Sequence, residues 1–207
     1  MDPARVSAII FAGGRATRLG GVNKALLEVG GRPIIDRIVD AVGPLAAELL
    51  LLANDRALAD LADRAGLRLV LDPDPHAGVL PALAAALAVA TGDVCLAVAC
   101  DMPFVSRPLF ERLLAVQQEQ SADVVIPRTA EHLEPMHAVY RRTPALAAIR
   151  AALARGDQRM VSYFQDVRVV QLPEAEARTV EPDLRPFFNV NTPTDLAEAQ
   201  RLASGQS

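Results

Sequence analysis

A loop rich in glycines and cations directly follows the first apolar run of the sequence. The run covers residues 6–12, and the loop extends from Gly13 to Lys24. Glycine has no Cβ, so backbone N–H groups in such a loop can approach a phosphate and point at it. The loop also carries cations that neutralise phosphate charge, namely Arg15, Arg18 and Lys24. This composition predicts a phosphate-binding site, because a simple turn with solvated arginines would not need so many glycines and cations.

The spacing within this loop excludes two common nucleotide-binding motifs. The glycines do not follow the G-x-G-x-x-G pattern of dinucleotide-binding folds. Lys24 is preceded by Asn23 and followed by Ala25, so the segment is not a P-loop either. The loop therefore predicts a phosphate site of another kind.

Asp101 is the second candidate for chemistry. It follows the apolar run 94–99 and precedes Met102 and Pro103. A carboxylate at a strand end suits Mg²⁺, which binds one or two carboxylates together with phosphate and water. The alternative is a turn aspartate ahead of a proline, which is common. The phosphate-binding loop in the same chain favours the metal role.

The elements that must position these residues alternate along the chain. We expect strands at 6–12, 48–53, 67–71, 94–99 and 122–126, and helices at 33–39, 56–65, 80–90 and from 106 onwards. This alternation predicts an α/β fold, a three-layer α/β/α arrangement with a mostly parallel twisted sheet. Parallel strands end at one edge, where such sheets bind ligands, so the loop and Asp101 should meet there.

The pattern changes after about residue 127. Short strands are expected at 135–140 and 167–172, a helix from 143 to 156, and a helix that begins at Thr192. We expect antiparallel strands at the sheet edge and a wall for a second substrate. No linker or repeat separates the halves. The sequence predicts a single domain over 1–207, with a nucleotide-binding half at about 1–126 and an acceptor-binding half at about 127–207.

Composition excludes several classes of function. Hydrophobic residues make up 51% of the chain and charged residues 22%, as in globular proteins. The net charge is −4 and aromatic residues make up only 4%, which argues against nucleic acid or a membrane surface as partner. No segment is apolar over the length that a membrane span needs. Cys95 and Cys100 do not form a C-x-x-C pair, and we expect a cytoplasmic protein without disulfides.

The pattern Ala12-Gly13-Gly14-x-x-x-Arg18-Leu19-Gly20-Gly21-x-x-Lys24 resembles the signature of nucleotidyltransferases that activate small phosphorylated molecules. Over nearly the whole chain the sequence is most similar to the molybdenum cofactor guanylyltransferases. The other segments that carry the resemblance are 92–93, 100–103, 134–140, 156–159 and 189–193.

The resemblance implies a reaction. GTP would bind at the first strands, and the terminal phosphate of molybdopterin, carrying molybdenum, would attack the α-phosphorus. Pyrophosphate would leave, which gives the guanine dinucleotide cofactor. Positioning and charge neutralisation suffice for such a displacement, so no protein nucleophile is required. GTP and molybdopterin are the implied substrates, and molybdoenzymes or other cofactor-biosynthesis proteins are implied transient contacts.

The resemblance also implies residue roles. The catalytic residues would be Lys24, Asp101 and Arg18. The nucleotide would be bound by Phe11, Ala12, Gly13, Gly14, Lys24, Asn54, Asp72 and Asp101. Asp101 would hold Mg²⁺, the implied cofactor. The acceptor would be bound by Arg159, Asn189 and Asn191, where the two asparagines would share one side of a strand. Asp72 could accept the N1–H and the amino group of guanine, or could merely form a turn before Pro73.

Three departures from the family pattern bear on substrate choice. Asn23 stands where the family usually has aspartate, Thr17 replaces a frequent arginine, and Gly78–Ala82 replaces a Gly-Pro-Leu-x-Gly segment. A cytidylyltransferase for the same cofactor, a transferase for a sugar phosphate, and a non-catalytic nucleotide-binding assembly factor are the alternatives. His137 could contact the second substrate, but a lone histidine on a short strand is more often structural.

Overall fold

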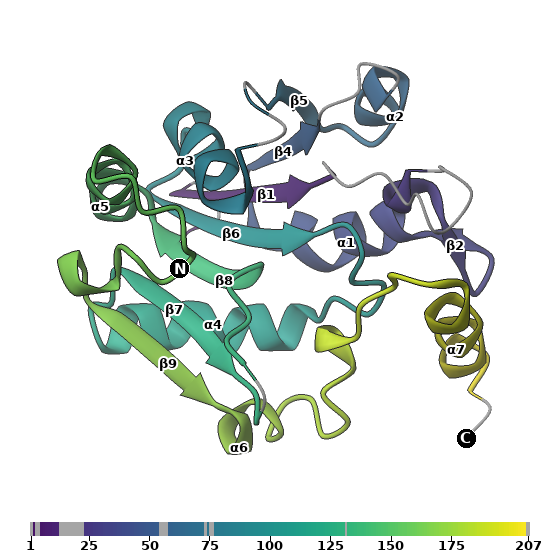
Figure 1. Ribbon diagram of the computed structural model, residues 1–207. Coiled ribbons are helices and arrows are strands. Elements are labelled where there is room, and N and C mark those ends of the chain that lie inside the picture. Colours follow the sequence, from purple (N-terminus) through teal and green to yellow (C-terminus); the bar gives the residue numbers. More distant parts are fainter. Residues whose placement is uncertain are drawn as a thin grey trace.

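The computed structural model describes residues 2, 5–12, 23–53, 58–72, 74, 77–130 and 132–205 (Figure 1). A seven-stranded sheet has the order β5-β4-β1-β6-β8-β7-β9. Its strands are β1 (Val6–Phe11), β4 (Glu48–Ala53), β5 (Arg68–Leu71), β6 (Val94–Ala99), β7 (Val124–Arg128), β8 (His137–Arg141) and β9 (Val169–Pro173). In Figure 1 the sheet runs from β5 at the top to β9 at the bottom.

Only β8 runs against the other strands of this sheet. It pairs antiparallel with β6 on one side and with β7 on the other, whereas β1, β4, β5 and β6 pair in parallel and β9 pairs parallel with β7. The mostly parallel α/β fold is therefore confirmed. The expected position of the antiparallel addition was wrong, because β8 lies inside the sheet and not at its edge. β8 bonds to β6 on one side and to β7 on the other, so its backbone is paired on both sides, and its residues 138–140 are buried.

Helices cover both faces of the sheet. The helices are α1 (Ile34–Val42), α2 (Ala59–Arg64), α3 (Val79–Val89), α4 (Arg107–Glu119), α5 (Arg142–Ala154), α6 (Glu174–Ala177) and α7 (Pro193–Ala203). The 3₁₀ turns are η3 (Lys24–Leu26), η4 (Gly43–Leu45), η6 (Phe164–Asp166) and η7 (Arg185–Phe187), and a small hairpin joins β2 (Glu28–Val29) to β3 (Arg32–Pro33). Among the described helices, none is long and apolar enough to cross a membrane.

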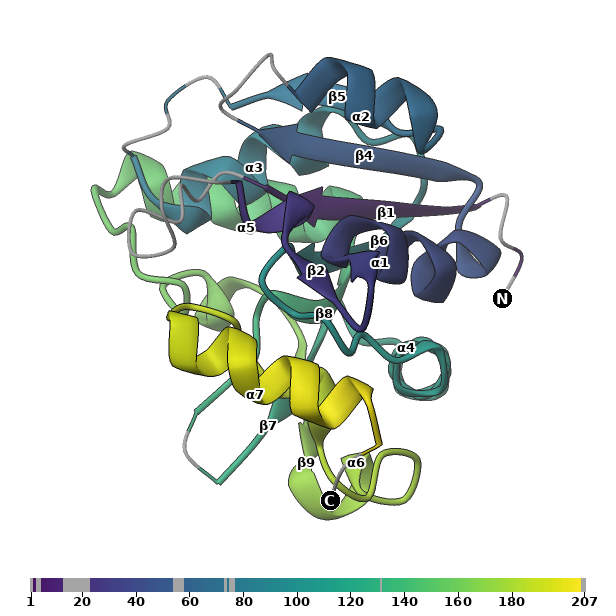
Figure 2. The ribbon, with the colours of Figure 1, turned by 90° about the vertical axis from the view of Figure 1, so that its right-hand side faces the viewer.

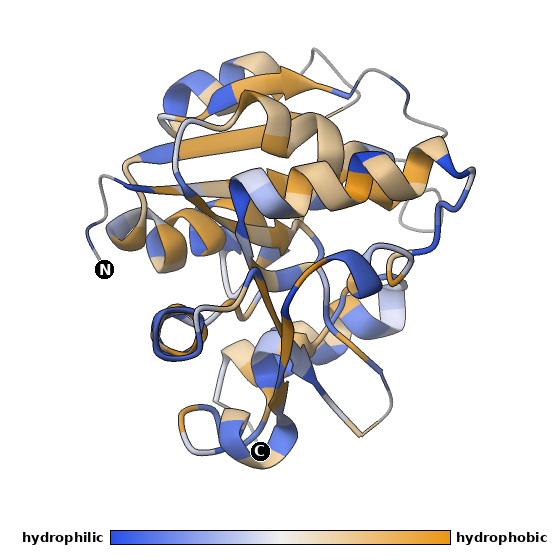
Figure 3. Ribbon diagram, turned by 90° about the vertical axis from the view of Figure 1, so that its left-hand side faces the viewer, coloured by the Kyte–Doolittle hydropathy of each residue, from blue (hydrophilic) through white to orange (hydrophobic). Residues whose placement is uncertain are grey.

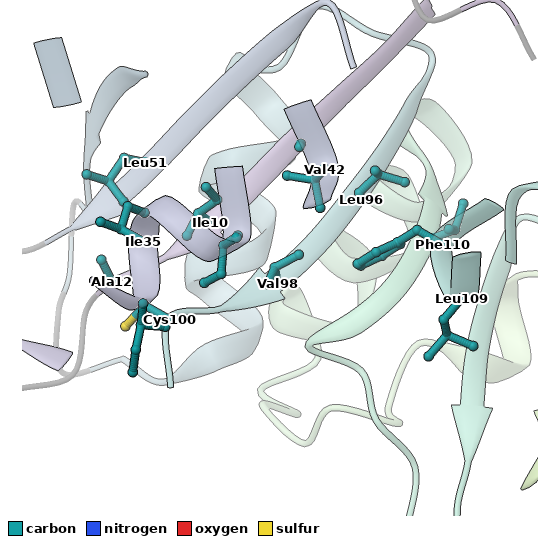
Figure 4. Packing of buried hydrophobic residues seen from close by; sticks show 14 of the residues in the cluster. Ile10, Ala12, Ile35, Val42, Leu51, Leu96, Val98, Cys100, Leu109 and Phe110 are labelled. Carbon is teal, nitrogen blue, oxygen red and sulfur yellow. The ribbon is translucent and has the colours of Figure 1, made fainter. Parts of the chain in front are cut away.

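Two hydrophobic cores lie on opposite faces of the sheet. Side chains of α1 and α4 fill one core and side chains of α3 and α5 fill the other. Successive residues of β1 and β6 alternate between the cores, as the period of a strand requires. Figure 4 shows Ile10 and Val98 of the strands packed beside Ile35 and Val42 of α1. Figure 3 shows the hydrophobic strands between the layers, with hydrophilic residues gathered in the loops and on parts of the helices.

The same alternation separates the two cysteines. Both thiols are free and buried. Cys95 belongs to the core beneath α3 and α5, and Cys100 belongs to the core beneath α1 and α4. The sheet therefore lies between them, and they do not form a disulfide.

Candidate active site

The carboxyl ends of β1 and β6 bring the two halves of the site together. The Ala12 N–H donates to the Leu52 carbonyl at 2.7 Å, and the Cys100 N–H donates to the Phe11 carbonyl at 3.0 Å. These bonds extend the sheet pairing one residue beyond the strands. The residues that follow β1 and β6 therefore leave the sheet side by side, as the parallel topology predicts. Figure 2 shows this side of the molecule, with α7 crossing in front of it.

Lys24 is held beside the end of β1 by the side chain of Asn23. Asn23 caps the η3 turn, because its Oδ1 accepts from the Ala25 N–H at 3.0 Å. Its Nδ2 donates to the Ala12 carbonyl at 3.4 Å, a weak bond back to the strand. One amide side chain thus joins the turn that carries Lys24 to the sheet.

Lys24, Asp101 and Asn191 form a polar cluster. The Lys24 Nζ lies 3.0 Å from Asp101 Oδ2 and 2.5 Å from Asn191 Oδ1. The side chains of Lys24 and Asp101 are only 14% and 21% exposed. A partly buried ion pair is screened less by salt than a surface pair. The structure therefore joins residues that are 77 and 167 positions apart in the sequence.

One carboxylate oxygen of Asp101 takes no part in the ion pair with Lys24. This oxygen, Oδ1, is buried and accepts no hydrogen bond from any residue that the structure describes. Buried carboxylate oxygens are normally paired, so this atom fits a cation. Within the described ranges no three His, Cys, Asp or Glu side chains gather to hold a metal. This donor set suits Mg²⁺, which takes its other ligands from phosphate and water.

Asn191 is positioned by the start of α7. Asp195 accepts from the Asn191 N–H at 2.8 Å and from the Thr192 N–H at 2.7 Å, and Thr192 Oγ1 accepts from the Asp195 N–H. This capping box confirms the predicted helix start. The pKa of Asp195 is lowered, first by the bond from Asn191 and less by the charge of Lys24. The Val190 N–H donates to the Asp101 carbonyl at 2.8 Å and fixes the segment to the β6 loop.

A cavity of about 460 Å³ opens beside this cluster. It is lined by Phe11, Leu52, Asp72, Gly78, Val79, Ala82, Ala99, Asp101, Met102, Glu134, Pro135, Met136 and Asn189. Phe11, Leu52 and Ala99 lie at the carboxyl ends of their strands, and Asp72, Asp101 and Met102 follow such ends, as expected for an α/β sheet. The volume and the mixed lining suit a nucleotide-sized ligand with a charged end at Asp101.

The chain matches the model of the MobA-like NTP transferase domain over residues 8–172. It is 35% identical over 199 residues to a probable molybdenum cofactor guanylyltransferase of Pelotomaculum thermopropionicum, which covers 96% of this chain and 94% of the relative. The protein belongs to the MobA-like NTP transferase family. It is therefore a nucleotidyltransferase, which confirms the predicted resemblance.

Two further similarities extend this assignment. A molybdenum cofactor guanylyltransferase of Desulfosudis oleivorans is 34% identical over 197 residues, or 94% of each chain. The crystal structure of molybdopterin-guanine dinucleotide biosynthesis protein A from Archaeoglobus fulgidus is similar with a TM-score of 0.81 and 26% identity, over 96% of this chain and 99% of that one. A 2-C-methyl-D-erythritol 4-phosphate cytidylyltransferase from Thermus thermophilus shares the fold at a TM-score of 0.69 and 19% identity, over 95% and 98% of the two chains.

The structure gathers most of the described residues that the family resemblance pointed to. Phe11, Asp72, Asp101 and Asn189 line the cavity, whereas Ala12 is buried in the core beneath α1 and α4 and is not part of the described lining. Lys24 and Asn191 lie in the adjoining cluster. The predicted residues Gly13, Gly14, Arg18 and Asn54 lie outside the described residues.

Asn189 and Asn191 were expected on one face of a strand, and that expectation was wrong. The segment after η7 is a loop, in which Asn189 lines the cavity while Asn191 meets Lys24. The N–H of Asn191 is taken by the Asp195 side chain and is therefore not free for strand pairing. Asn189 is oriented by its own bond from Nδ2 to the Phe187 carbonyl at 3.0 Å.

Arg159 does not reach the cavity lining in this structure. Its guanidinium pairs with Asp157 at 2.6 Å in an exposed turn, and its side chain is 77% exposed. A neighbouring carboxylate is thus its partner here. Binding of the acceptor phosphate would require it to leave Asp157.

Asp72 forms a turn and also lies at the cavity. Its Oδ1 accepts from the Asp74 N–H at 3.1 Å, so it forms a turn, and its side chain also lines the cavity. Gly78 has a φ of +96° ahead of α3, a conformation that favours glycine, and Val79 and Ala82 beyond it line the cavity wall. The departure from the family pattern at 78–82 therefore places Val79 and Ala82 in the cavity lining.

His137 takes the structural role. Its ring is buried, stacks on Phe110 with centroids 4.4 Å apart, and meets Phe187 edge-on at 5.5 Å. Neither ring nitrogen has a hydrogen-bond partner among the described residues. Burial lowers its pKa to about 3, so it is neutral. It is absent from the cavity lining.

Glu134 is the cavity residue that sequence reasoning missed. Its segment carried the family resemblance, but its carboxylate was assigned no role. The only signal was an acidic residue directly before Pro135 in the connection between two buried strands. That pattern is common in surface loops, so burial alone distinguishes it.

Proposed function

We propose that this protein transfers GMP from GTP to the terminal phosphate of molybdopterin that carries molybdenum. Pyrophosphate is released and the guanine dinucleotide cofactor is formed. The observation that carries the proposal is the Lys24–Asp101–Asn191 cluster at the mouth of the cavity, with Asp101 Oδ1 left unpaired. The names of the relatives from P. thermopropionicum and D. oleivorans support the choice of substrates.

The chain's own residues supply positioning and charge. Lys24 can turn from Asp101 to the triphosphate, because its ammonium is a compact charge on a flexible stem. Asp101 and Asn191 would hold Mg²⁺, which when bound neutralises phosphate charge and orients it for displacement. The attacking phosphate is already an anion, so the site needs no general base. The apolar wall at Val79, Ala82 and Met102 excludes water from the cavity.

Specificity for guanine would depend on Asp72. A carboxylate accepts from the N1–H and the amino group of guanine, donors that adenine lacks. Asp72 follows β5, which lies on the β1 side of β6, and it lines the same cavity as Asp101. This position supports a role for Asp72 at the base of a nucleotide gripped at Lys24. Phe11 and Leu52 offer apolar contact to the ring from neighbouring strands.

The setting of the reaction is part of the proposal. Two buried free thiols suit a reducing compartment, and we place the protein in the cytoplasm. The product must pass from this cavity to an apo-enzyme, which makes transient contact with molybdoenzymes or their assembly proteins the expected route.

A nucleotide panel tests this function. Purified protein with Mg²⁺ and molybdopterin should release pyrophosphate from GTP at least about tenfold faster than from CTP or ATP, because the site rejects bases that leave Asp72 unpaired. Equal rates with CTP would remove the guanine assignment. No release with any nucleotide in the presence of the acceptor would contradict the transfer itself.

A further inference from the structure

Glu134 carries a buried carboxylate that the fold does not use. The residue is 7% exposed and lies in the connection between β7 and β8. Its backbone is held independently of its side chain, because its N–H donates to the Pro127 carbonyl and its carbonyl accepts from the His137 N–H, both at 3.0 Å. Removing the carboxylate would therefore leave the connection in place.

The carboxylate of Glu134 has no hydrogen-bond donor within the described part of the chain. Among the described residues, it contacts the side chain of His132, whose Nε2 lies 3.7 Å from Oε1 and whose side chain is 64% exposed. Burial raises the pKa of Glu134, which reflects the cost of keeping this charge out of water. A buried acceptor without donors destabilises the free protein, so a ligand that brings donors would relieve this cost.

The position of Glu134 restricts which ligand that is. The sheet order places β5 and Asp72 on one side of β6, and the β7–β8 connection with Glu134 on the other, with Asp101 between them. Reacting phosphates bind at Asp101 and Lys24, and a base bound on the β5 side leaves the Glu134 side for the second substrate. Met102, Pro135 and Met136 line this side of the cavity, and their apolar side chains suit the faces of a flat ring.

The hydrogen-bonding pattern of a carboxylate indicates which chemical group Glu134 recognises. A carboxylate only accepts hydrogen bonds, and its two oxygens match two neighbouring N–H donors. A 2-amino-4-oxopyrimidine ring presents such a pair, the ring N–H and the amino group. Guanine and pterins both contain it. We propose that Glu134 accepts the 2-amino-4-oxo edge of the acceptor's pterin ring, an inference that rests on the proposed function.

Glu134 and Asp72 then divide the cavity between them. Each carboxylate accepts hydrogen bonds from the same pair of donors, but on different substrates and on opposite sides of Asp101. In such an arrangement each ring has a carboxylate of its own, while the phosphates of the two substrates share one centre. Glu134 thereby acts as a specificity residue for the acceptor.

Equilibrium binding without turnover tests this assignment. The probes are 6-hydroxymethylpterin and 6-hydroxymethyllumazine, which has an oxo group in place of the amino group, together with GTP and ITP, each titrated calorimetrically. Wild-type protein should bind the pterin at least about tenfold more tightly than the lumazine, because the lumazine keeps the ring N–H donor but sets a carbonyl oxygen against the second carboxylate oxygen. Glu134→Gln should remove most of this preference while its affinity for GTP stays within about twofold.

Asp72→Asn provides the matched control. It should reduce the preference for GTP over ITP and leave the preference for pterin over lumazine intact. If Glu134→Gln changed only the affinity for GTP, the acceptor assignment would be overturned, and the carboxylate would instead bind the base of GTP. Unchanged pterin preference in Glu134→Gln would overturn it as well. Neither outcome depends on catalysis, so failure of the proposed transfer reaction is detected separately by pyrophosphate release.

Stability gives a second readout of the same variant. Because the carboxylate lacks donors in the free protein, Glu134→Gln should unfold at the same temperature as the wild type or at a higher one. A clear fall in the midpoint would show that the carboxylate has a structural partner and would overturn the proposal. Glu134→Asp keeps the charge but shortens the side chain, and should retain part of the pterin preference.

Discussion

At the scale of single residues, Asp101 has the sharpest consequence. Asp101→Asn keeps the shape of the side chain and its bond with Lys24 but removes the charge that a cation needs. We expect kcat to fall by about 10²–10³-fold, as for loss of a main electrostatic contact in the transition state. The unfolding midpoint should change little, because the side chain is held mainly at the cavity rim. Steady-state rates and thermal melts measure both.

Asp40→Asn is the matched control for Asp101→Asn. Asp40 lies on α1, pairs with Arg32 at 2.7 Å and has a side chain that is 62% exposed. Its loss touches neither the Lys24 cluster nor the described cavity lining. The variant should keep kcat within about twofold, as exposed pairs contribute little. If Asp101→Asn retained full activity beside this control, Asp101 would not hold the metal.

His137 makes a pH prediction at the same scale. Its pKa is about 3 in the folded protein, against an ordinary value of 6.5, because the ring is buried. The unfolded chain therefore binds more protons between these values, and stability is lost as pH falls below about 6.5. At pH 5 the loss from this residue is about 2 kcal/mol, at 1.36 kcal/mol per unit.

Urea unfolding at pH 7.5 and pH 5 checks this dependence. His137→Phe keeps an aromatic ring against Phe110 and removes the titrating group, so its loss of stability between the two pH values should be smaller by about 2 kcal/mol. His132→Gln, at an exposed histidine, should keep the wild-type dependence. If His137→Phe lost as much stability as the wild type between the two pH values, another group would control the acid sensitivity.

At the scale of elements, the start of α7 links helix capping to the site. Asp195→Ala removes the acceptor for the N–H groups of Asn191 and Thr192. We expect a loss of about 0.5–2 kcal/mol of stability, typical of a lost cap. Because the same bonds hold Asn191 at Lys24, we also expect KM for GTP to rise several-fold.

Ser106→Ala is the control for this element. Ser106 caps α4 by accepting from the Leu109 N–H at 3.2 Å, but α4 contributes no side chain to the described cavity lining. The variant should lose a similar amount of stability without a change in KM. Equal KM values in both cap variants would show that Asn191 does not need its capping bonds.

At the scale of the whole molecule, the two ends of the parallel strands have different roles. The carboxyl ends of the strands carry the cavity. The opposite ends are held by Glu48, which accepts from Ser7 Oγ at 2.5 Å and from the Thr91 N–H at 2.8 Å, and by Gly92, whose N–H donates to Ser7 Oγ at 2.9 Å. A Cβ on Gly92 would lie 2.7 Å from the Ser7 backbone nitrogen. β1 and β6 therefore approach each other there through glycine.

This separation makes Gly92→Ala a test of the architecture. The new methyl group must displace the backbone of β1, and we expect a loss of about 1–3 kcal/mol of stability, as for other overpacked sites. At 25 °C the folded fraction should keep kcat/KM within about twofold, since the cavity lies at the other ends of the strands. Urea unfolding and initial rates measure the two effects. A fall in kcat/KM larger than the fall in folded protein would show that the two ends are coupled.

Local sequence determined the strands and the helices, because apolar runs, prolines and capping residues act over a few neighbours. It also predicts a phosphate-binding loop from Gly13 to Lys24. Lys24, Asp101 and the cap at Thr192 were predictable for that reason. The sequence alone could not determine that β8 lies between β6 and β7, since antiparallel insertion depends on which strand edges remain unpaired after the others assemble.

Tertiary structure alone decided the rest of the site. The loop from Asn189 to Asn191 received its shape from bonds to Asp101 and Asp195, not from strand pairing. Glu134 became significant only once its surroundings buried it without a donor. Burial and hydrogen-bond satisfaction arise from residues far apart in the chain, so the type and spacing of nearby residues cannot reveal them.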